Sequence, residues 1–130
     1  LVDSPVGLAA WIYEKMWSWT DNAGAPEDAL SSDAVLDNIM LYWLTASGAS
    51  AARMYWESFA AIGNADLTVN LPAGISTFPR EITKAPRKWA ERILKNIVYW
   101  NDTDRGGHFA AWEQPAIFVD EVRSCFAVMR

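Results

Sequence analysis

The fold class follows from residues 67–100, which read LTVNLPAGISTFPREITKAPRKWAERILKNIVYW. Apolar and polar residues alternate over residues 67–71, which is typical of a strand with one buried face. Residues 97–100 form a continuous apolar run, which is typical of a strand buried on both faces. Between them, Pro86 can start a short helix that ends near Ile93. The order strand, helix, strand predicts two parallel strands with packed helices, which is the α/β class.

The segments after each strand extend this pattern. Pro72 and Gly74 indicate a loop that begins directly after the first strand. Residues 101–112 are expected to form a second loop, and Pro115 starts a last helix. The apolar face of that helix is expected to comprise Phe118, Val119, Val122, Phe126 and Met129. Two parallel strands do not make a stable sheet alone, so we expect a larger fold whose remaining part lies upstream of Leu1.

The amino-terminal half is expected to be helical. Ser4-Pro5 is a typical helix start, and the first helix should end near Thr20. Residues 21–32 are interpreted as a surface loop that contributes no core residues. A second helix is expected from Asp33. Its apolar stripe consists of Val35, Leu36, Ile39, Met40, Trp43 and Leu44.

Glycines set the remaining boundaries of this half. Gly48 is expected to break the second helix, and a third helix should follow over residues 49–60. Gly63-Asn64 then ends the helical part. We therefore divide the chain into residues 1–62, which are helical, and residues 63–130, which carry both strands.

Composition and charge narrow the class of protein. The 130 residues include 11 Lys plus Arg and 16 Asp plus Glu, which gives a formal net charge of −5. A nucleic-acid partner is disfavoured, because such proteins need clustered cations. No apolar run approaches the roughly 20 residues of a membrane span, and we expect a cytoplasmic location. Cys125, the single cysteine, cannot form an internal disulfide; it falls beside the apolar face of the last helix and is expected to be a packing residue and not a nucleophile.

Polar residues that could carry chemistry follow both strands. In open α/β sheets the reactive groups lie on loops beyond the carboxyl ends of the strands. Glu81 follows the first strand and His108 follows the second, so parallel pairing should bring them close together. A carboxylate that accepts a hydrogen bond from one imidazole nitrogen leaves the other nitrogen as a general base, as in hydrolases. The alternative is a loop histidine bonded for structure beside a solvated glutamate.

Other kinds of site are disfavoured. Asp102, Asp104 and His108 lack a recognised metal-ligand spacing, so neither a metal nor another cofactor is expected. Residues 48–52, GASAA, are the nearest approach to a G-x-S-x-G nucleophile elbow, but they lack the second glycine and lie in a helical region. The chain is therefore expected to hold a base but no attacking group.

Four segments together carry a resemblance to a known family. They are DSPVGLAAWI at residues 3–12, FPRE at residues 78–81, PRKW at residues 86–89 and RGGHFAAWE at residues 105–113. Over essentially the whole chain, they resemble the carboxyl-terminal part of microsomal-type epoxide hydrolases, of the α/β-hydrolase superfamily. The resemblance implies the last two parallel strands of an α/β-hydrolase fold with flanking helices, preceded by helical elements of a lid.

The resemblance also implies a catalytic site. In that family an aspartate attacks an epoxide carbon to form a covalent ester, and a histidine paired with Glu or Asp activates the water that hydrolyses it. Carried over, His108 is the general base and Glu81 its acid partner. Tyr55, within RMYWE at residues 53–57, matches one of two lid tyrosines that hold the epoxide oxygen and donate a proton. Tyr55 also lies on the apolar face of its predicted helix, where it could be a core aromatic.

The implied partners follow from this assignment. The substrate is a hydrophobic epoxide, which reacts with water to give a vicinal diol, in detoxification or the catabolism of aromatic hydrocarbons. The family's nucleophile lies before the matched segment, so the chain needs an upstream amino-terminal segment with that aspartate and should be inactive alone. A homodimer is left open. The alternatives are a non-catalytic helical binding module, or another α/β-hydrolase such as a dehalogenase or esterase.

Overall fold

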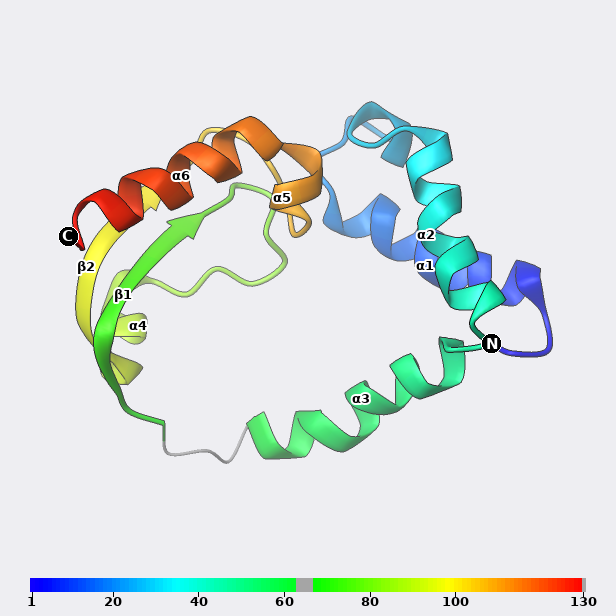
Figure 1. Ribbon diagram of the computed structural model, residues 1–130, viewed down its shortest axis with the longest axis horizontal. Helices are drawn as coiled ribbons and strands as arrows, with labels where there is room; N and C mark the ends of the chain where they lie inside the picture. Colours follow the sequence, from blue (N-terminus) through cyan, green and yellow to red (C-terminus); the bar gives the residue numbers. More distant parts are fainter. Residues whose placement is uncertain (63–66, 130) are drawn as a thin grey trace. The chain divides into compact units, whose positions relative to one another are not determined.

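The computed structural model describes residues 1–62 and 67–129, which form two compact units (Figure 1). The first unit comprises Leu1–Ser18 and Asn22–Asp66, and the second comprises Trp19–Asp21 and Leu67–Arg130. Each unit has buried residues of its own. None of the helices in the described ranges is long and apolar enough to cross a membrane.

Helices dominate the first unit. They are α1 (Pro5–Trp19, whose last residue belongs to the second unit), the 3-10 turn η1 (Pro26–Asp28), α2 (Ser32–Leu44) and α3 (Gly48–Ile62). The predicted start of α1 is confirmed, because the Ser4 hydroxyl accepts a hydrogen bond from the Gly7 amide at 3.1 Å. The core side chains come from α1, from the segment around η1 and from α2: Leu8, Ile12, Met16, Pro26, Leu30, Val35 and Ile39.

Three expectations for this unit need correction or fall outside the described residues. The segment over residues 21–32 does contribute to the core, because η1 folds Pro26 and Leu30 inward. The break between α2 and α3 lies before Gly48, at Ala46, which adopts a φ of 52°. Gly48 instead begins α3, where a Cβ would lie 2.9 Å from Leu8 Cδ1. The predicted helix end at Gly63-Asn64 lies outside the described residues.

The second unit contains the parallel pair that the sequence predicts. Strand β1 (Val69–Thr77) pairs with β2 (Leu94–Asp102) in parallel, and the register ends with Thr77 opposite Asp102. Helix α4 (Arg87–Ile93) connects the strands, and α5 (Ala110–Glu113) and α6 (Pro115–Ala127) follow β2. Figure 1 shows α6 running along the two strands. The loop expected over residues 101–112 is shorter than predicted, because its last three residues belong to the short helix α5.

The predicted end of the first strand is wrong. Strand β1 continues through Pro72 and Gly74, which were expected to begin a loop, and ends at Thr77. The register shifts on either side of Pro72–Ala73, and such irregularities accommodate a residue without an amide hydrogen. A Cβ at Gly74 would lie 2.1 Å from the Sγ of Cys125, so the glycine lets α6 approach the strand closely. Cys125 packs there, as the sequence predicts.

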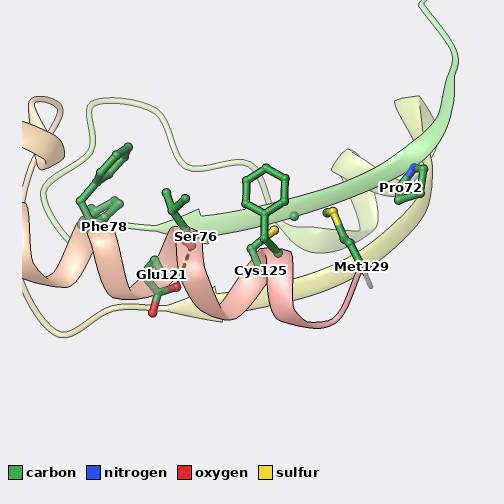
Figure 2. A pocket seen from close by; sticks show the side chains of 10 residues that line it. Pro72, Ser76, Phe78, Glu121, Cys125 and Met129 are labelled. Atoms are coloured by element: carbon green, nitrogen blue, oxygen red, sulfur yellow. Dashed lines mark hydrogen bonds between the residues drawn. The ribbon is translucent and has the colours of Figure 1, made fainter.

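Glu121 of α6 fixes this helix to both strands. Its carboxylate accepts hydrogen bonds from Ser76 Oγ at 2.7 Å, Tyr99 Oη at 3.0 Å and Asn101 Nδ2 at 2.8 Å. Figure 2 shows the bond to Ser76 at the edge of a pocket of about 450 Å³ between β1 and α6. Burial raises the pKa of Tyr99, and the hydrogen bond and negative charge of Glu121 raise it further. The described sheet therefore holds its last helix through one carboxylate as well as through apolar contacts.

Candidate functional site

The ends of the two strands place Glu81 and His108 together. Glu81 lies four residues after the end of β1, and His108 lies six residues after the end of β2. His108 Nδ1 donates a hydrogen bond to Glu81 Oε1 at 2.7 Å, which confirms their predicted proximity. Their side chains are 36% and 29% exposed, respectively, so neither is fully buried by the described residues.

Backbone hydrogen bonds hold the two strand-end loops against each other. The Thr103 amide donates to the Thr77 carbonyl at 2.9 Å, directly beyond the last strand pair. Further on, the Arg80 amide donates to the Gly106 carbonyl at 3.1 Å, and Arg80 and Gly107 form an isolated parallel bridge. The parallel pairing therefore extends past the strands to the residues that precede Glu81 and His108.

Gly106 is required at its position in this arrangement. Its φ is 109°, a conformation that residues with a Cβ rarely adopt. A Cβ there would also lie 2.7 Å from Cδ1 of Phe78, which is buried at the start of the loop that carries Glu81. The absence of a side chain at residue 106 lets the two loops meet.

The hydrogen bond to Glu81 determines what the imidazole of His108 can do. When Nδ1 carries the proton, Nε2 keeps a lone pair and can accept a proton from a reactant. The ring centroids of Trp19 and Phe109 each lie 5.1 Å from the imidazole centroid, in edge-to-face geometry. Glu81 Oε1 also accepts the Ile82 amide at 2.8 Å, which fixes the carboxylate. The pair has the geometry of a general base with an orienting acid.

Two further carboxylates accept hydrogen bonds from the backbone around His108, and neither is predicted from the sequence. Glu113 is 8% exposed, and its side chain accepts the amides of Asp21, Gly107 and Phe109. Asp21 in turn accepts the Gly106 amide at 2.8 Å. Glu113 ends the segment RGGHFAAWE, which carries part of the family resemblance, but the residues around it do not indicate that its carboxylate is buried. Asp21 lies 85 residues from its partner Gly106, so no local signal could have identified that contact.

Tyr55 belongs to the first unit and lies on α3. Its ring meets Trp11 edge-to-face at 6.3 Å between centroids and stacks on Phe59 at 6.0 Å. It lines a cavity of about 360 Å³, together with residues that include Trp11, Tyr42, Met54 and Phe59. Tyr55 is 49% exposed, so it is not a fully buried core aromatic. The structure therefore brings Glu81 and His108 together and places Tyr55 at an apolar cavity of the helical unit.

The other candidate positions have structural partners. Asp102 Oδ1 accepts a hydrogen bond from the Thr77 hydroxyl. Ser50 lies on α3 and not on a strand-to-helix turn. Its hydroxyl donates a hydrogen bond to the Ser47 carbonyl. Within residues 1–62 and 67–129, no group of three or more His, Cys, Asp or Glu side chains is arranged to hold a metal ion.

Comparisons with known proteins place this chain in a family. The chain is 57% identical over its whole length to a Stigmatella aurantiaca protein named as a candidate epoxide hydrolase, and it covers 29% of that protein. It is 35% identical to epoxide hydrolase 1 of Sus scrofa over 99% of the chain and 31% of the relative. No family model matches the chain. The chain thus spans about 30% of the length of these curated relatives.

Solved structures agree with these relatives. The crystal structure of juvenile hormone epoxide hydrolase from the silkworm Bombyx mori matches with a TM-score of 0.86 and 31% identity, over 97% of this chain and 34% of the other. The epoxide hydrolase of Aspergillus niger matches with a TM-score of 0.81 and 33% identity, over 98% and 31%. The fold and the matches define the class as the α/β-hydrolases. Within that class, the chain belongs to the epoxide hydrolase family.

Proposed function

We propose that this sequence is part of an enzyme that converts apolar epoxides to vicinal diols through a covalent ester. The observation that carries the proposal is the 2.7 Å hydrogen bond between His108 Nδ1 and Glu81 Oε1, on strand-end loops of an epoxide hydrolase family member. Because the chain spans about 30% of its curated relatives, the attacking aspartate would come from an upstream segment. The 130-residue chain alone would then be inactive.

Tyr55 would act in the first half of the reaction. An oxygen of the upstream carboxylate forms a bond to one epoxide carbon, and the bond between that carbon and the epoxide oxygen breaks. The electron pair goes to the oxygen, and the Tyr55 hydroxyl donates a proton to it. A tyrosine hydroxyl stays protonated at neutral pH, so it can donate to a developing alkoxide.

His108 would act in the second half. Its Nε2 removes a proton from a water molecule, whose oxygen attacks the ester carbonyl. The tetrahedral intermediate collapses, the bond to the alkyl oxygen breaks, and the diol leaves with a proton from the imidazolium. The second proton of the water, left on the new carboxylic acid, returns to the Tyr55 phenolate and restores both groups. Glu81 stabilises the imidazolium and holds the ring in the tautomer that keeps Nε2 free of a proton at the start.

The aromatic cavity of the first unit supports an apolar substrate. Trp11, Tyr42, Met54 and Phe59 line the same space as Tyr55, and aromatic and Met side chains favour apolar ligands. We assign residues 1–62 to the end of a lid and its return to the core, and residues 63–130 to the last strands and helices of the α/β core. Aromatic epoxides as substrates would give the enzyme a role in detoxification or aromatic catabolism, and we propose a cytoplasmic location separately.

Product analysis tests the proposal. The full-length protein that contains this sequence is incubated with styrene oxide as an apolar aromatic probe, and products are separated by chromatography. The expected result is the vicinal diol from the unaltered protein and a loss of about 100-fold or more for His108→Gln. Glu91→Gln, which removes an exposed charge 3.0 Å from Arg87 on α4, is the control and should keep full activity. No diol, with turnover of a nitrophenyl ester or a haloalkane instead, would indicate an esterase or dehalogenase.

A further inference from the structure

Glu113 holds the backbone on both sides of His108. Its Oε2 accepts the Gly107 amide at 3.0 Å, and its Oε1 accepts the Phe109 amide at 3.0 Å. The His108 amide itself donates to the Trp19 carbonyl at 2.8 Å. Three consecutive amides are thus occupied, and two of them depend on one carboxylate.

The same carboxylate connects this segment to the end of α1. Glu113 Oε2 also accepts the amide of Asp21 at 2.7 Å. The Asp21 side chain then accepts the Gly106 amide through Oδ2 at 2.8 Å, and its Oδ1 lies 3.5 Å from Nε of Arg80. Because Arg80 directly precedes Glu81, the network reaches both members of the candidate pair.

The network leaves no room for adjustment at Gly107. A Cβ there would lie 2.5 Å from the Trp19 carbonyl oxygen, 2.9 Å from the Asp21 nitrogen and 2.9 Å from Glu113 Oε1. The backbone before His108 is therefore in close contact with the carboxylate and with the end of α1. A shift of the carboxylate would move the residue next to the imidazole.

A carboxylate is the group that this geometry requires. A buried charge is tolerated only when hydrogen bonds satisfy it, and bonds from amides to a carboxylate are stronger than bonds between neutral groups. Glutamine has the same shape but one acceptor oxygen, so its NH₂ group would face at least one of the three amides as a second donor. In each of these three hydrogen bonds a Glu113 oxygen accepts from a backbone amide. The NH₂ group of a glutamine cannot accept a hydrogen bond, so glutamine cannot replace all three.

We propose that Glu113 is a positioning residue, which holds the His108 imidazole in line with the ester that it hydrolyses. This inference rests on the proposed role of His108 as the base. Glu113 acts through the backbone of residues 107–109 and touches no reacting atom. Because a misplacement of about 1 Å can reduce a rate by about 100-fold, its loss should slow the step that needs His108 and leave the attack on the epoxide unchanged.

Single-turnover kinetics of the full-length protein test the proposal. Styrene oxide is the probe, formation of the ester is followed by tryptophan fluorescence, and its decay is followed by rapid quench with intact mass spectrometry. For Glu113→Gln we expect ester formation at the unaltered rate and ester hydrolysis about 10- to 100-fold slower, so the ester accumulates. Glu113→Asp keeps the charge and should recover part of the hydrolysis rate. Loss of stability alone would lower the active fraction and would not change one rate constant selectively.

Glu121→Gln is the matched control. Glu121 is also a partly buried carboxylate with three hydrogen-bond donors in the same unit, but it holds α6 to the strands. This variant should lose stability and keep the ratio of the two rate constants. If Glu113→Gln does not fold, Glu113→Asp carries the test, with a smaller decrease in hydrolysis expected because the shorter side chain no longer reaches all three amides. An unchanged ratio in the folded variant would overturn the inference.

The outcomes separate this inference from the proposed function. If His108→Gln forms a persistent ester but the Glu113 variants hydrolyse it at the unaltered rate, only the positioning role falls. If neither the unaltered protein nor His108→Gln forms an ester, the proposed function falls and the positioning role falls with it.

Discussion

Replacing Glu81 with glutamine removes the acid partner of His108 and keeps the size of the side chain. In the structure, Nδ1 of His108 donates to Glu81 Oε1 at 2.7 Å, which is a short bond to a charged acceptor. We expect Glu81→Gln to slow ester hydrolysis and to leave ester formation unchanged, because the imidazolium develops only in the hydrolysis step.

The magnitude follows from two effects of the substitution. A hydrogen bond to a charged group contributes about 1.5 to 3 kcal/mol, and the lower half applies because the two side chains are 36% and 29% exposed. About 1.5 to 2 kcal/mol corresponds to roughly a 10- to 30-fold slower step. The glutamine NH₂ group can in addition donate to Nδ1, which places the imidazole proton on Nε2, where it blocks the base. Together we expect a loss of about 100-fold or more.

The assay is single-turnover hydrolysis of the ester, measured by rapid quench and intact mass spectrometry of the full-length protein. Glu91→Gln is the control, because Glu91 is an exposed glutamate whose partner is Arg87 and not a histidine. Hydrolysis by Glu81→Gln within twofold of the unaltered rate would refute the role of Glu81, since the 2.7 Å bond would then contribute nothing to the step.

Three further predictions use other parts of the structure. Tyr55→Phe should slow ester formation by about 10- to 100-fold in stopped-flow fluorescence and leave hydrolysis unchanged; equal slowing of both steps would contradict a proton-donor role. Gly74→Ala should lower the free energy of unfolding by about 1 to 3 kcal/mol in denaturant titrations, because the new Cβ would lie 2.1 Å from the Sγ of Cys125. Adding Cys125→Ala should recover part of this loss, and purely additive effects would argue against the clash. The raised pKa of Tyr99 means that its contribution to stability is complete below the unfolded value near ~10 and is lost as pH rises through the higher folded value. Glu121→Gln should lower the pKa of Tyr99 in an absorbance titration at about 295 nm, and an unchanged value would exclude the contribution of Glu121 to the shift.

The α/β organisation could be predicted because both strands and the helix between them have clear local patterns. The position of the first strand's end could not, because Pro72 and Gly74 usually indicate a loop. The role of Gly74 depends on α6, because a side chain at this position would collide with Cys125. Tertiary packing therefore decides where β1 ends, and a prediction from the local sequence alone ends the strand too early. Tertiary packing also explains why Pro26 is buried in the core although residues 21–32 are predicted to form a surface loop.

The candidate pair could be predicted because parallel pairing places successive strand ends at one edge of the sheet. Glu81 and His108 each follow a strand, so the topology alone brings their loops together. The carboxylates that hold the backbone of these loops could not be predicted from the topology. Glu113 and Asp21 accept backbone amides from segments up to 92 residues away, and no periodicity or motif spacing reports such contacts.

The most direct test of the catalytic assignment is the intact mass of the His108→Gln variant after incubation with styrene oxide. The Glu81–His108 arrangement implies that this variant still forms the ester and cannot hydrolyse it. We expect the protein mass to increase by the mass of one epoxide molecule and to keep that increase, whereas the unaltered protein returns to its original mass. An unshifted mass, or release of diol from the variant at the unaltered rate, would contradict the assignment of His108 as the base.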